Sequence, residues 1–546
     1  MKVVIIGGVA GGASCATRLR RLDESAEIVI LERGDHVSYA NCGLPYYVGG
    51  KIEREESLTV ASPGFLRARF GIDVRVRSEA VGIDTEKKVV RVRERDGREY
   101  DEPYDKLVLA PGASAKTFGM SGKGVFVLRD VNDATGLYRH ITETDRKSAL
   151  VAGGGFIGVE TAENLVRRGL EVTLAEFAPQ VMPPLDPEMA QLVADELAKN
   201  GVTVLTGVGV SSVAAEDDGV KVAFTDGREG KFGAVVLALG VAPETSLAKA
   251  AGIELAKSGG IAVDGAMRTS VPDIYAAGDA VSVIGADGKD ALVPLAGPAN
   301  RQGRSVADNI AGIPSSNGRK VLGASVVRTF GLTAASVGRN EKQLKRAGEK
   351  FLKVYAYPFS HATYYPGAAQ MTLKLLFAPD GRVLGAQGVG ADGVEKQMDV
   401  ISTAMKFGGT VRDLAEVELC YAPPFNSAKS PVNMLGFIAS NVLDGLMDVT
   451  CPEDVKEEDF VLDVRTPQEY AAGHIAGSVN IPLDELRERL GELPKDTAIT
   501  VTCAIGLRGY IAARILAGHG FKALDLTGGY RMYATAKRAG IVKTAR

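Results

Sequence analysis

Two segments of this 546-residue chain share one pattern, a short apolar strand that ends in a glycine-rich turn and continues into a helix. They are residues 3–12 and 149–158. Each helix is followed by a second apolar strand that closes with an acid, Glu32 or Glu176. This order is typical of parallel βαβ units in doubly wound sheets. The chain is therefore predicted to be an α/β protein with two Rossmann-like dinucleotide-binding domains.

The two turns predict bound adenine dinucleotides. Glycine lets the backbone approach a pyrophosphate, the helix start offers N–H groups, and the acid accepts from a ribose hydroxyl. The second turn has the full G-x-G-x-x-G spacing, whereas Val9 takes the middle position of the first. Two matches in one chain favour two nucleotide sites over two ordinary turns. The predicted contacts are Gly7, Gly8, Gly11, Gly12 and Glu32 in the first unit, and Gly153, Gly155, Gly158 and Glu176 in the second.

The second acid also predicts which nicotinamide cofactor binds. No basic residue follows Glu176 before Pro187. A 2′-phosphate there would meet a carboxylate and no cation, so we expect NADH rather than NADPH.

Composition excludes several classes of partner. Lys plus Arg number 64 against 67 for Asp plus Glu, which gives no reason to expect nucleic acid or an anionic membrane. The chain has no cationic leader and no long apolar span, so we expect a cytoplasmic protein. Its five Cys and five His lack metal-ligand spacing, and no metal site is expected.

The residues of the two turns resemble the pyridine nucleotide-disulfide oxidoreductase family. Residues 107–113 resemble its A-T-G turn with Pro111 in place of Thr, 275–279 its second FAD motif, and 239–244 the segment after its NAD domain. The resemblance covers residues 1 to about 445. It implies FAD in the first unit and NAD(P)H in the second. It adds cofactor contacts at Arg33, Ala110, Pro111, Gly112, Gly278, Asp279 and Gly240.

A single cysteine narrows the resemblance. Cys42 lies in the run 38–46 and has no second Cys near it. This is similar to the single-cysteine branch, which holds coenzyme A-disulfide reductases, NADH-dependent persulfide reductases, NADH peroxidases and NADH oxidases. Residues 7–13, 361–367 and 421–425 look most similar to the first two groups. The resemblance implies a homodimer in which Tyr364 and Tyr421 reach the thiol across the interface, although core packing is the alternative for both.

The first helix offers a substrate hypothesis. Ser14, Arg18 and Arg21 are spaced to share one helical face, which by itself could be a solvated basic surface. The resemblance implies that they contact coenzyme A, whose phosphates suit a cationic face. It adds Ser38, Asn41 and Lys429 as further contacts, and Asn300 stands where some members have His.

The last ninety or so residues resemble a rhodanese domain over their full length. The runs 463–465, 469–470, 473–478 and 480–483 match its signature. A strand then delivers Cys503 into a short loop that ends at Arg508. Inward backbone N–H groups and positive charge would favour a thiolate or persulfide anion at Cys503, and a buried structural Cys is the alternative.

The predicted domains follow from these matches. They are an FAD-binding domain (1–115 and 245–320), an NAD(P)H-binding domain (116–244), an α+β dimerisation domain (321–445), a linker (446–458) and a rhodanese-like α/β domain (459–546). Within them we expect a strand at 373–377 and a helix at 393–407.

Together these features predict an FAD-dependent NADH reductase of sulfur–sulfur bonds. Electrons would pass from NADH through FAD to Cys42, whose position at a helix start should lower its pKa. Coenzyme A persulfide or polysulfide is favoured over coenzyme A disulfide, because a rhodanese unit holds sulfane sulfur. The alternatives are an NADH peroxidase or oxidase that uses a sulfenic acid at Cys42, and a sulfur carrier or redox sensor. Cys15, Cys420 and Cys451 are expected to be inert, the first two in the core.

Overall fold

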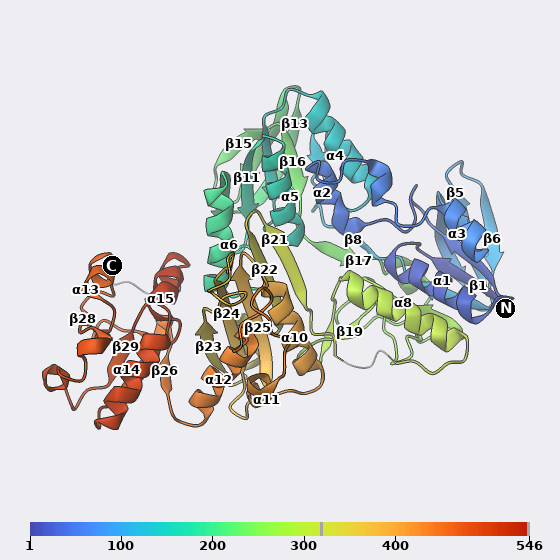
Figure 1. The fold of residues 1–546 in the computed structure, drawn as a ribbon. Coiled ribbons are helices and arrows are strands. Elements are labelled where there is room, and N and C mark those ends of the chain that lie inside the picture. The colour runs from blue at the N-terminus through green and yellow to red at the C-terminus, as the bar shows by residue number, and fades with distance from the viewer. Residues whose placement is uncertain (317–319, 543–546) are drawn as a thin grey trace. The chain divides into compact units, whose positions relative to one another are not determined.

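The computed structural model describes residues 1–316 and 320–542. The chain forms two compact units. The first contains Met1–Phe177 and Val208–Gly323, and the second contains Ala178–Gly207 and Ala324–Arg546. Figure 1 shows the elements of both units.

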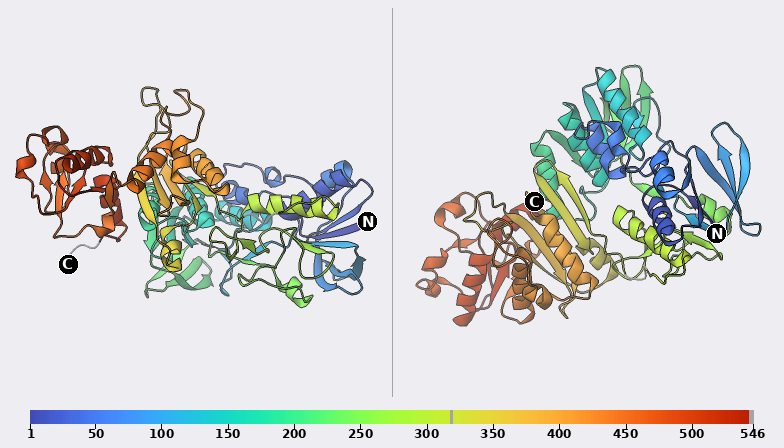
Figure 2. Two further views of the ribbon diagram at one scale, coloured as in Figure 1. Left: turned by 90° about the horizontal axis from the view of Figure 1, so that it is seen from below. Right: turned by 45° about the vertical axis from the view of Figure 1, so that its right-hand side comes forward.

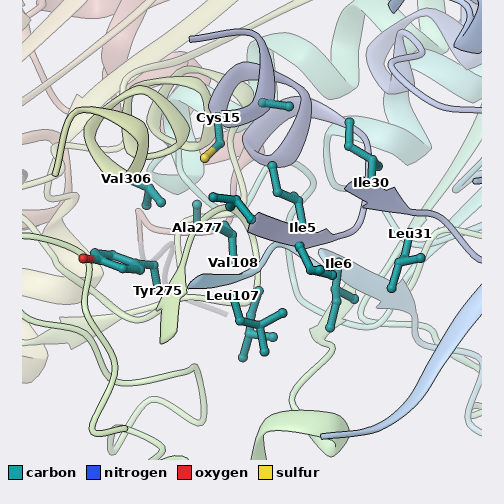
Figure 3. Packing of buried hydrophobic residues seen from close by; sticks show 14 of the residues in the cluster. Ile5, Ile6, Cys15, Ile30, Leu31, Leu107, Val108, Tyr275, Ala277 and Val306 are labelled. Carbon is teal, nitrogen blue, oxygen red and sulfur yellow. The ribbon is translucent and has the colours of Figure 1, made fainter. Parts of the chain in front are cut away.

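The first sheet of the first unit is parallel. Its strands, in spatial order, are β18 (Ile274–Ala276), β7 (Lys106–Leu109), β1 (Lys2–Ile6), β2 (Glu27–Leu31) and β3 (Asp73–Arg75). The central strands are almost wholly buried, as is typical of a parallel sheet covered on both faces. Figure 3 shows Ile5 and Val108 packed with Cys15 and Val306 of the covering helices. Because β1 has β2 on one side and β7 on the other, a crevice forms at the carboxyl end of β1.

Two helices close over this sheet. They are α1 (Ala10–Leu22) and α8 (Ala296–Ile310), which lie side by side (Figures 1 and 2). A Cβ on Gly303 of α8 would stand 2.2 Å from the carbonyl oxygen of Gly11, so only glycine permits this approach. The sheet β4 (Ser78–Asp84), β5 (Val89–Glu94) and β6 (Glu99–Pro103), light blue in Figure 2, completes this half together with α3 (Pro63–Phe70).

The other half of the first unit repeats this plan. Its parallel sheet contains, in order, β11 (Glu171–Glu176), β10 (Ser148–Ala152), β16 (Ala234–Leu237) and β9 (Val125–Phe126). The predicted βαβ units are thereby confirmed in both halves. Other elements of this half and of its connections are α2 (Leu44–Val48), α4 (Val131–Glu143), α5 (Phe156–Arg167), α7 (Ser246–Ala250), β8 (Ala113–Ala115), β17 (Val241–Pro243) and the antiparallel sheet β13 (Val210–Glu216), β14 (Gly219–Phe224) and β15 (Glu229–Phe232).

The second unit begins with an antiparallel sheet. Its order is β21 (Ser325–Thr329), β22 (Leu332–Gly338), β25 (Val383–Gly390), β24 (Met371–Phe377) and β23 (Leu352–Ala356). The strand predicted at 373–377 is β24, and the helix predicted at 393–407 is α10 (Val394–Lys406). The remaining elements are α6 (Pro187–Lys199), β12 (Val202–Thr206), α9 (Glu341–Ala347), α11 (Val411–Glu416) and α12 (Pro431–Leu443).

The C-terminal part of this unit is a parallel sheet, which confirms the predicted fold class. The order is β26 (Asp448–Thr450), β30 (Ala523–Leu526), β29 (Ile499–Thr502), β27 (Phe460–Asp463) and β28 (Val479–Asn480). Its helices are α13 (Pro467–Ala471), α14 (Leu507–Gly518) and α15 (Gly529–Arg538). One expectation needs correction, because the predicted linker 446–458 contains β26, which pairs with β30 at the edge of this sheet.

A buried ionic cluster ties the second unit together. Lys374 on β24 is fully buried, and its ammonium contacts the carboxylates of Asp186 at 2.9 Å, Glu188 at 2.5 Å and Glu341. Among the described residues these three acids are the group that could hold a metal, but a lysine ammonium lies among them. Lys353 extends the cluster by bonding Glu341 at 2.7 Å and Glu453, next to β26, at 2.5 Å.

Candidate active site

The crevice at the carboxyl ends of β1, β2 and β7 is a cavity of about 810 Å³. Thirteen of the residues predicted for cofactor, substrate or catalysis line it. They are Gly7, Gly11, Ser14, Glu32, Arg33, Ser38, Asn41, Cys42, Ala110, Pro111, Gly112, Gly278 and Asp279. Predicted flavin contacts and the predicted thiol therefore share one cavity. Gly8 and Gly12 are buried in the turn behind it.

The first glycine turn is fixed by close backbone contacts. Gly7 has a φ of +94°, and a Cβ on Gly12 would stand 1.9 Å from the Gly7 carbonyl oxygen. Glu32 then accepts a hydrogen bond from the Gly8 N–H at 2.9 Å. The acid at the end of β2 thus holds the turn as well as lining the cavity.

The second turn has the same construction. Gly153 has a φ of +108°, a Cβ on Gly158 would stand 1.9 Å from its carbonyl oxygen, and Glu176 accepts from the Gly154 N–H at 2.6 Å. A Cβ on Gly155 would point into open space, so this side of the turn is accessible. Gly240 lies between β16 and β17, with a φ of +89°.

The helices that follow the turns can bind anions. Neither α1 nor α5 has a side-chain cap at its N-terminus, and neither has an acid in its first turn. Their first N–H groups and the positive end of each helix dipole are therefore available to a phosphate. These features fit a pyrophosphate at each turn.

Cys42 lies in a 3-10 turn, Asn41–Gly43, immediately before α2, and is exposed to the cavity. Partial desolvation in this recess raises the pKa of its thiol, and the carboxylates of Glu160 and Asp279 raise it further. Arg129 lowers the pKa of Cys42, but by less than these effects raise it. The expectation of a lowered pKa at a helix start was therefore wrong for the protein alone, because desolvation and two acids outweigh the short turn.

Sequence reasoning missed two partners of this thiol. Tyr46, four residues after Cys42, donates to Glu160 on α5 at 2.9 Å. Burial raises the pKa of Glu160 to about 7, so its proton is exchangeable near neutrality. Tyr46 closes the quoted run 38–46 and Glu160 lies two residues after the second glycine turn, but only the fold brings α2 and α5 together.

A third missed residue is Arg129. It donates to the Ala113 carbonyl at 2.6 Å and contacts Asp279 at 3.2 Å. It precedes the α4 capping residues and belongs to no motif, so the sequence carried no signal for it.

The predicted coenzyme A contacts divide into two groups. Ser14, Ser38 and Asn41 line the cavity, and Ser14 donates to Asn300 at 2.5 Å. Ser38 has a φ of +48°, a strained conformation for a residue other than glycine. Arg18 instead pairs with Asp308 of α8 at 2.7 Å, which offsets its charge. Arg21 and Lys429 are exposed.

The two predicted tyrosines form a pair in the second unit. Their hydroxyl oxygens lie 2.6 Å apart, and Tyr364 is 74% exposed. The hydrogen bond that Tyr364 shares with Tyr421 raises the pKa of Tyr364. The core-packing alternative therefore does not fit either side chain in one chain. Cys420 is also exposed, which corrects its assignment to the core: it lies in an irregular segment that leaves it open to solvent.

The predicted sulfur-transfer loop is present between β29 and α14. The Cys503 sulfur is buried and accepts from the Gly506 N–H at 3.0 Å. Gly529 packs behind the loop so closely that a Cβ there would stand 2.5 Å from the Cys503 carbonyl oxygen. Burial raises the pKa of the Cys503 thiol, whereas backbone N–H groups of the loop lower it.

Arg508 is held by an acid. Its guanidinium donates to both carboxylate oxygens of Glu469, at 2.7 and 2.8 Å, and lowers the pKa of Glu469 to about 2. The positive charge expected at the loop is therefore largely offset. Cys15 is buried as expected, and burial raises the pKa of Cys451 to about 12.

Comparisons with known proteins agree with this arrangement. Residues 1–303 match the family model "Pyridine nucleotide-disulphide oxidoreductase", and residues 324–431 match its dimerisation domain. Residues 451–536 match the rhodanese-like domain. No helix of the described residues could cross a membrane.

Individual relatives match over most of their length. A coenzyme A disulfide reductase of Staphylococcus epidermidis is 35% identical over 80% of this chain and 99% of its own. The crystal structure of reduced CoADR-RHD from Bacillus anthracis is 45% identical, with a TM-score of 0.96 and 99% of both chains covered. The NAD-dependent persulfide reductase from A. fulgidus is 38% identical, with a TM-score of 0.92 over 98% of this chain and 100% of that chain.

Proposed function

Because the chain belongs to the pyridine nucleotide-disulphide oxidoreductase family, and is thus an oxidoreductase that acts on sulfur groups, we propose that it reduces persulfides or polysulfides with NADH. The observation that carries the proposal is the shared cavity, in which the exposed thiol of Cys42 stands among the predicted flavin contacts. A homodimer is proposed from the dimerisation domain.

The cavity that contains Cys42 fits FAD. Its glycine turn and the uncapped start of α1 suit a pyrophosphate, Glu32 suits a ribose hydroxyl, and the cavity continues to Cys42. Bound FAD would supply a two-electron relay between the nicotinamide and a sulfur atom. The second turn fits the nicotinamide cofactor. We infer NADH over NADPH because the Glu176 carboxylate occupies the place where a 2′-phosphate would need a cation.

The residues of the chain then perform thiol–disulfide chemistry. The Cys42 thiolate attacks the sulfur–sulfur bond, forms a mixed disulfide or persulfide, and releases a thiol or hydrosulfide. Glu160, held by Tyr46, can accept the thiol proton because its pKa is about 7. Tyr364 and Tyr421 of the partner subunit are proposed to complete the site, since both hydroxyls are exposed and bonded to each other.

The substrate is proposed to carry coenzyme A. Ser14, Ser38 and Asn41 in the cavity are its contacts, and the exposed Arg21 and Lys429 suit its phosphates. Arg18 would contribute less, because Asp308 already pairs with it. In the C-terminal domain, Cys503 is proposed to hold sulfane sulfur, in a loop shaped by Gly506, Arg508 and Gly529.

A substrate panel tests this proposal. The purified full chain is mixed with NADH and coenzyme A persulfide, polysulfide, coenzyme A disulfide, peroxide or oxygen, and NADH loss and sulfide release are measured. We expect the sulfur substrates to be reduced fastest, and Cys42→Ser to lose at least about a thousandfold in rate. Cys420→Ser, a change at another exposed thiol, is the matched control and should retain activity. Full sulfide release by Cys42→Ser would refute the mechanism, and faster turnover of peroxide or oxygen would favour a sulfenic acid enzyme.

A further inference from the structure

One buried acid near the sulfur-transfer loop has no role so far. Asp525 on β30 is 4% exposed, and its Oδ1 atom has no hydrogen-bond partner. A buried carboxyl oxygen without a partner is unfavourable, so this one calls for an explanation.

The position of Asp525 relative to Cys503 supplies one. Asp525 pairs in register with Val501 of β29, two residues before Cys503. Gly509, in the first turn of α14, separates the two side chains. A Cβ there would stand 2.3 Å from Asp525 Oδ1 and 3.7 Å from the Cys503 sulfur. The carboxyl group and the sulfur are thus neighbours across a glycine that leaves no side chain between them.

Most other charged groups on the surrounding elements are paired or exposed: Asp463 of β27 pairs with Arg465 at 2.6 Å, and Lys537 of α15 is exposed. On α14, Arg508 pairs with Glu469 and Arg514 donates to the Leu446 carbonyl. On α15, Arg531 donates to Gln370 and Arg538 to Asp195. Asp448 on β26 is exposed. Among the described groups, burial alone accounts for the raised pKa of Asp525, about 8, and Asp525 in turn raises the pKa of Cys503.

We propose that Asp525 is a positioning residue that controls the ionisation of Cys503, so that the buried pair carries one negative charge at a time. This inference deepens the proposed sulfur-transfer role of the C-terminal domain and rests on it. With Asp525 protonated, the loop N–H groups can stabilise an anionic sulfur or persulfide. With Asp525 ionised, two adjacent buried charges would repel, and the sulfur stays protonated.

No redox step is required by this proposal. When Cys503 loses its proton, the proton goes to solvent or to the Asp525 carboxylate. In sulfur transfer, an acceptor thiolate attacks the outer sulfur of the Cys503 persulfide, the sulfur–sulfur bond breaks, and the Cys503 sulfur leaves with the electron pair. A neutral Asp525 favours this departure, and an ionised one opposes it.

The test measures how the alkylation rate of Cys503 depends on pH in the Asp525→Asn variant. This variant keeps the shape of the side chain and removes the titration. The full-length protein is alkylated with iodoacetamide at a series of pH values, and the peptide that contains Cys503 is quantified by mass spectrometry, which separates it from the other four cysteines. We expect the alkylation midpoint to move down by about one to two pKa units, and the rate near pH 8 to rise about tenfold or more.

Asp484→Asn, a change at an exposed acid of the same domain, is the control and should leave the midpoint unchanged. If Asp525 had only a structural role, Asp525→Asn would lower the free energy of unfolding but would leave the pH midpoint of Cys503 alkylation unchanged. An unchanged midpoint in a folded Asp525→Asn protein overturns the inference. If Asp525→Asn does not fold, Asp525→Ser removes the same charge with a smaller side chain and takes its place.

A second readout separates this inference from the proposed function. Thiosulfate donates sulfur to Cys503, cyanide accepts it, and thiocyanate is measured across the same pH range. We expect the wild-type rate to decline as Asp525 ionises and the Asp525→Asn rate to continue rising. If the wild type forms no thiocyanate that depends on Cys503, the sulfur-transfer function fails, while the alkylation midpoint still decides the role of Asp525.

Discussion

Replacing Lys374 by Met should destabilise the second unit, because it removes the cation at the centre of three buried acids. Lys374 is fully buried and contacts Asp186, Glu188 and Glu341. Breaking a buried ion pair by removing one partner costs about 3–5 kcal/mol in general.

The structure places the expected cost in the middle of that range. Glu341 keeps Lys353 at 2.7 Å and Lys345 at 2.8 Å. Asp186 keeps the side-chain amide of Gln387 at 2.6 Å. Glu188 keeps only the Tyr355 hydroxyl, at 2.9 Å. Asp186 and Glu188 are therefore both left without an ion pair, and we expect a loss of about 4 kcal/mol in the free energy of unfolding.

The stability that Lys374→Met loses should depend on pH. Lys374 lowers the pKa values of Glu188 and Glu341 against the desolvation that would raise them. In the wild type, this stabilisation is present above the usual pKa of a Glu and is lost as the pH falls below it. In Lys374→Met, desolvation raises the pKa of Glu188, which then takes up a proton. The difference in the free energy of unfolding between Lys374→Met and the wild type should therefore be largest near pH 8 and smaller near pH 5.

Urea unfolding followed by far-UV circular dichroism measures the difference at both pH values. Lys345→Met is the matched control, because the Lys345 side chain is 61% exposed and its ion pair with Glu341 should contribute under about 1 kcal/mol. A Lys374→Met protein as stable as the control, or one with the same deficit near pH 5 and pH 8, would refute the electrostatic reasoning.

Three further changes test the two nucleotide turns and the thiol. Glu160→Gln removes an acid that raises the pKa of Cys42, so the pH midpoint of Cys42 alkylation should fall by about one unit; a midpoint that does not move would contradict this electrostatic effect of Glu160. Glu176→Gln keeps an acceptor for the Gly154 N–H but removes the charge, and kcat/KM for NADPH relative to NADH should rise about tenfold in steady-state assays; an unchanged ratio would show that this acid does not select the cofactor. Gly12→Ala places a Cβ against the Gly7 carbonyl oxygen, and the purified variant should lose most of its flavin absorbance, whereas Gly136→Ala on α4, where an added Cβ meets nothing within 4 Å, should retain it.

The sequence predicted best the elements that need a particular residue type at a particular spacing. The two glycine turns required glycine at close backbone contacts, and the structure has those contacts at Gly12 and Gly158. Strand β24 and helix α10 followed from apolar patterning. The edge strand β26 was missed because it has only three residues. So short a strand, followed closely by Pro, Glu and Asp, shows too little alternation to indicate a strand.

The chemistry of the thiols could not be predicted in the same way. A pKa depends on every charge near the group, and neither Glu160 for Cys42 nor Asp525 for Cys503 is close in sequence. The motifs singled out Cys42 and Cys503 as candidates, but the direction of the pKa shift of each thiol came from the fold. Arg508 illustrates the same limit, because its motif position did not reveal that Glu469 offsets its charge.

The pairing of β26 with β30 bears on how this polypeptide can be divided. A truncation that starts at residue 459 would remove β26 and uncover a strand edge, which invites intermolecular association. A cut before residue 459 or before Met447 would leave Thr527 without the Tyr355 N–H that donates to it at 3.1 Å, and the cut before Met447 would also separate Glu453 from Lys353. A recombinant fragment, or an evolutionary exchange of this module, would therefore keep its edge strand only if the cut fell before Met447.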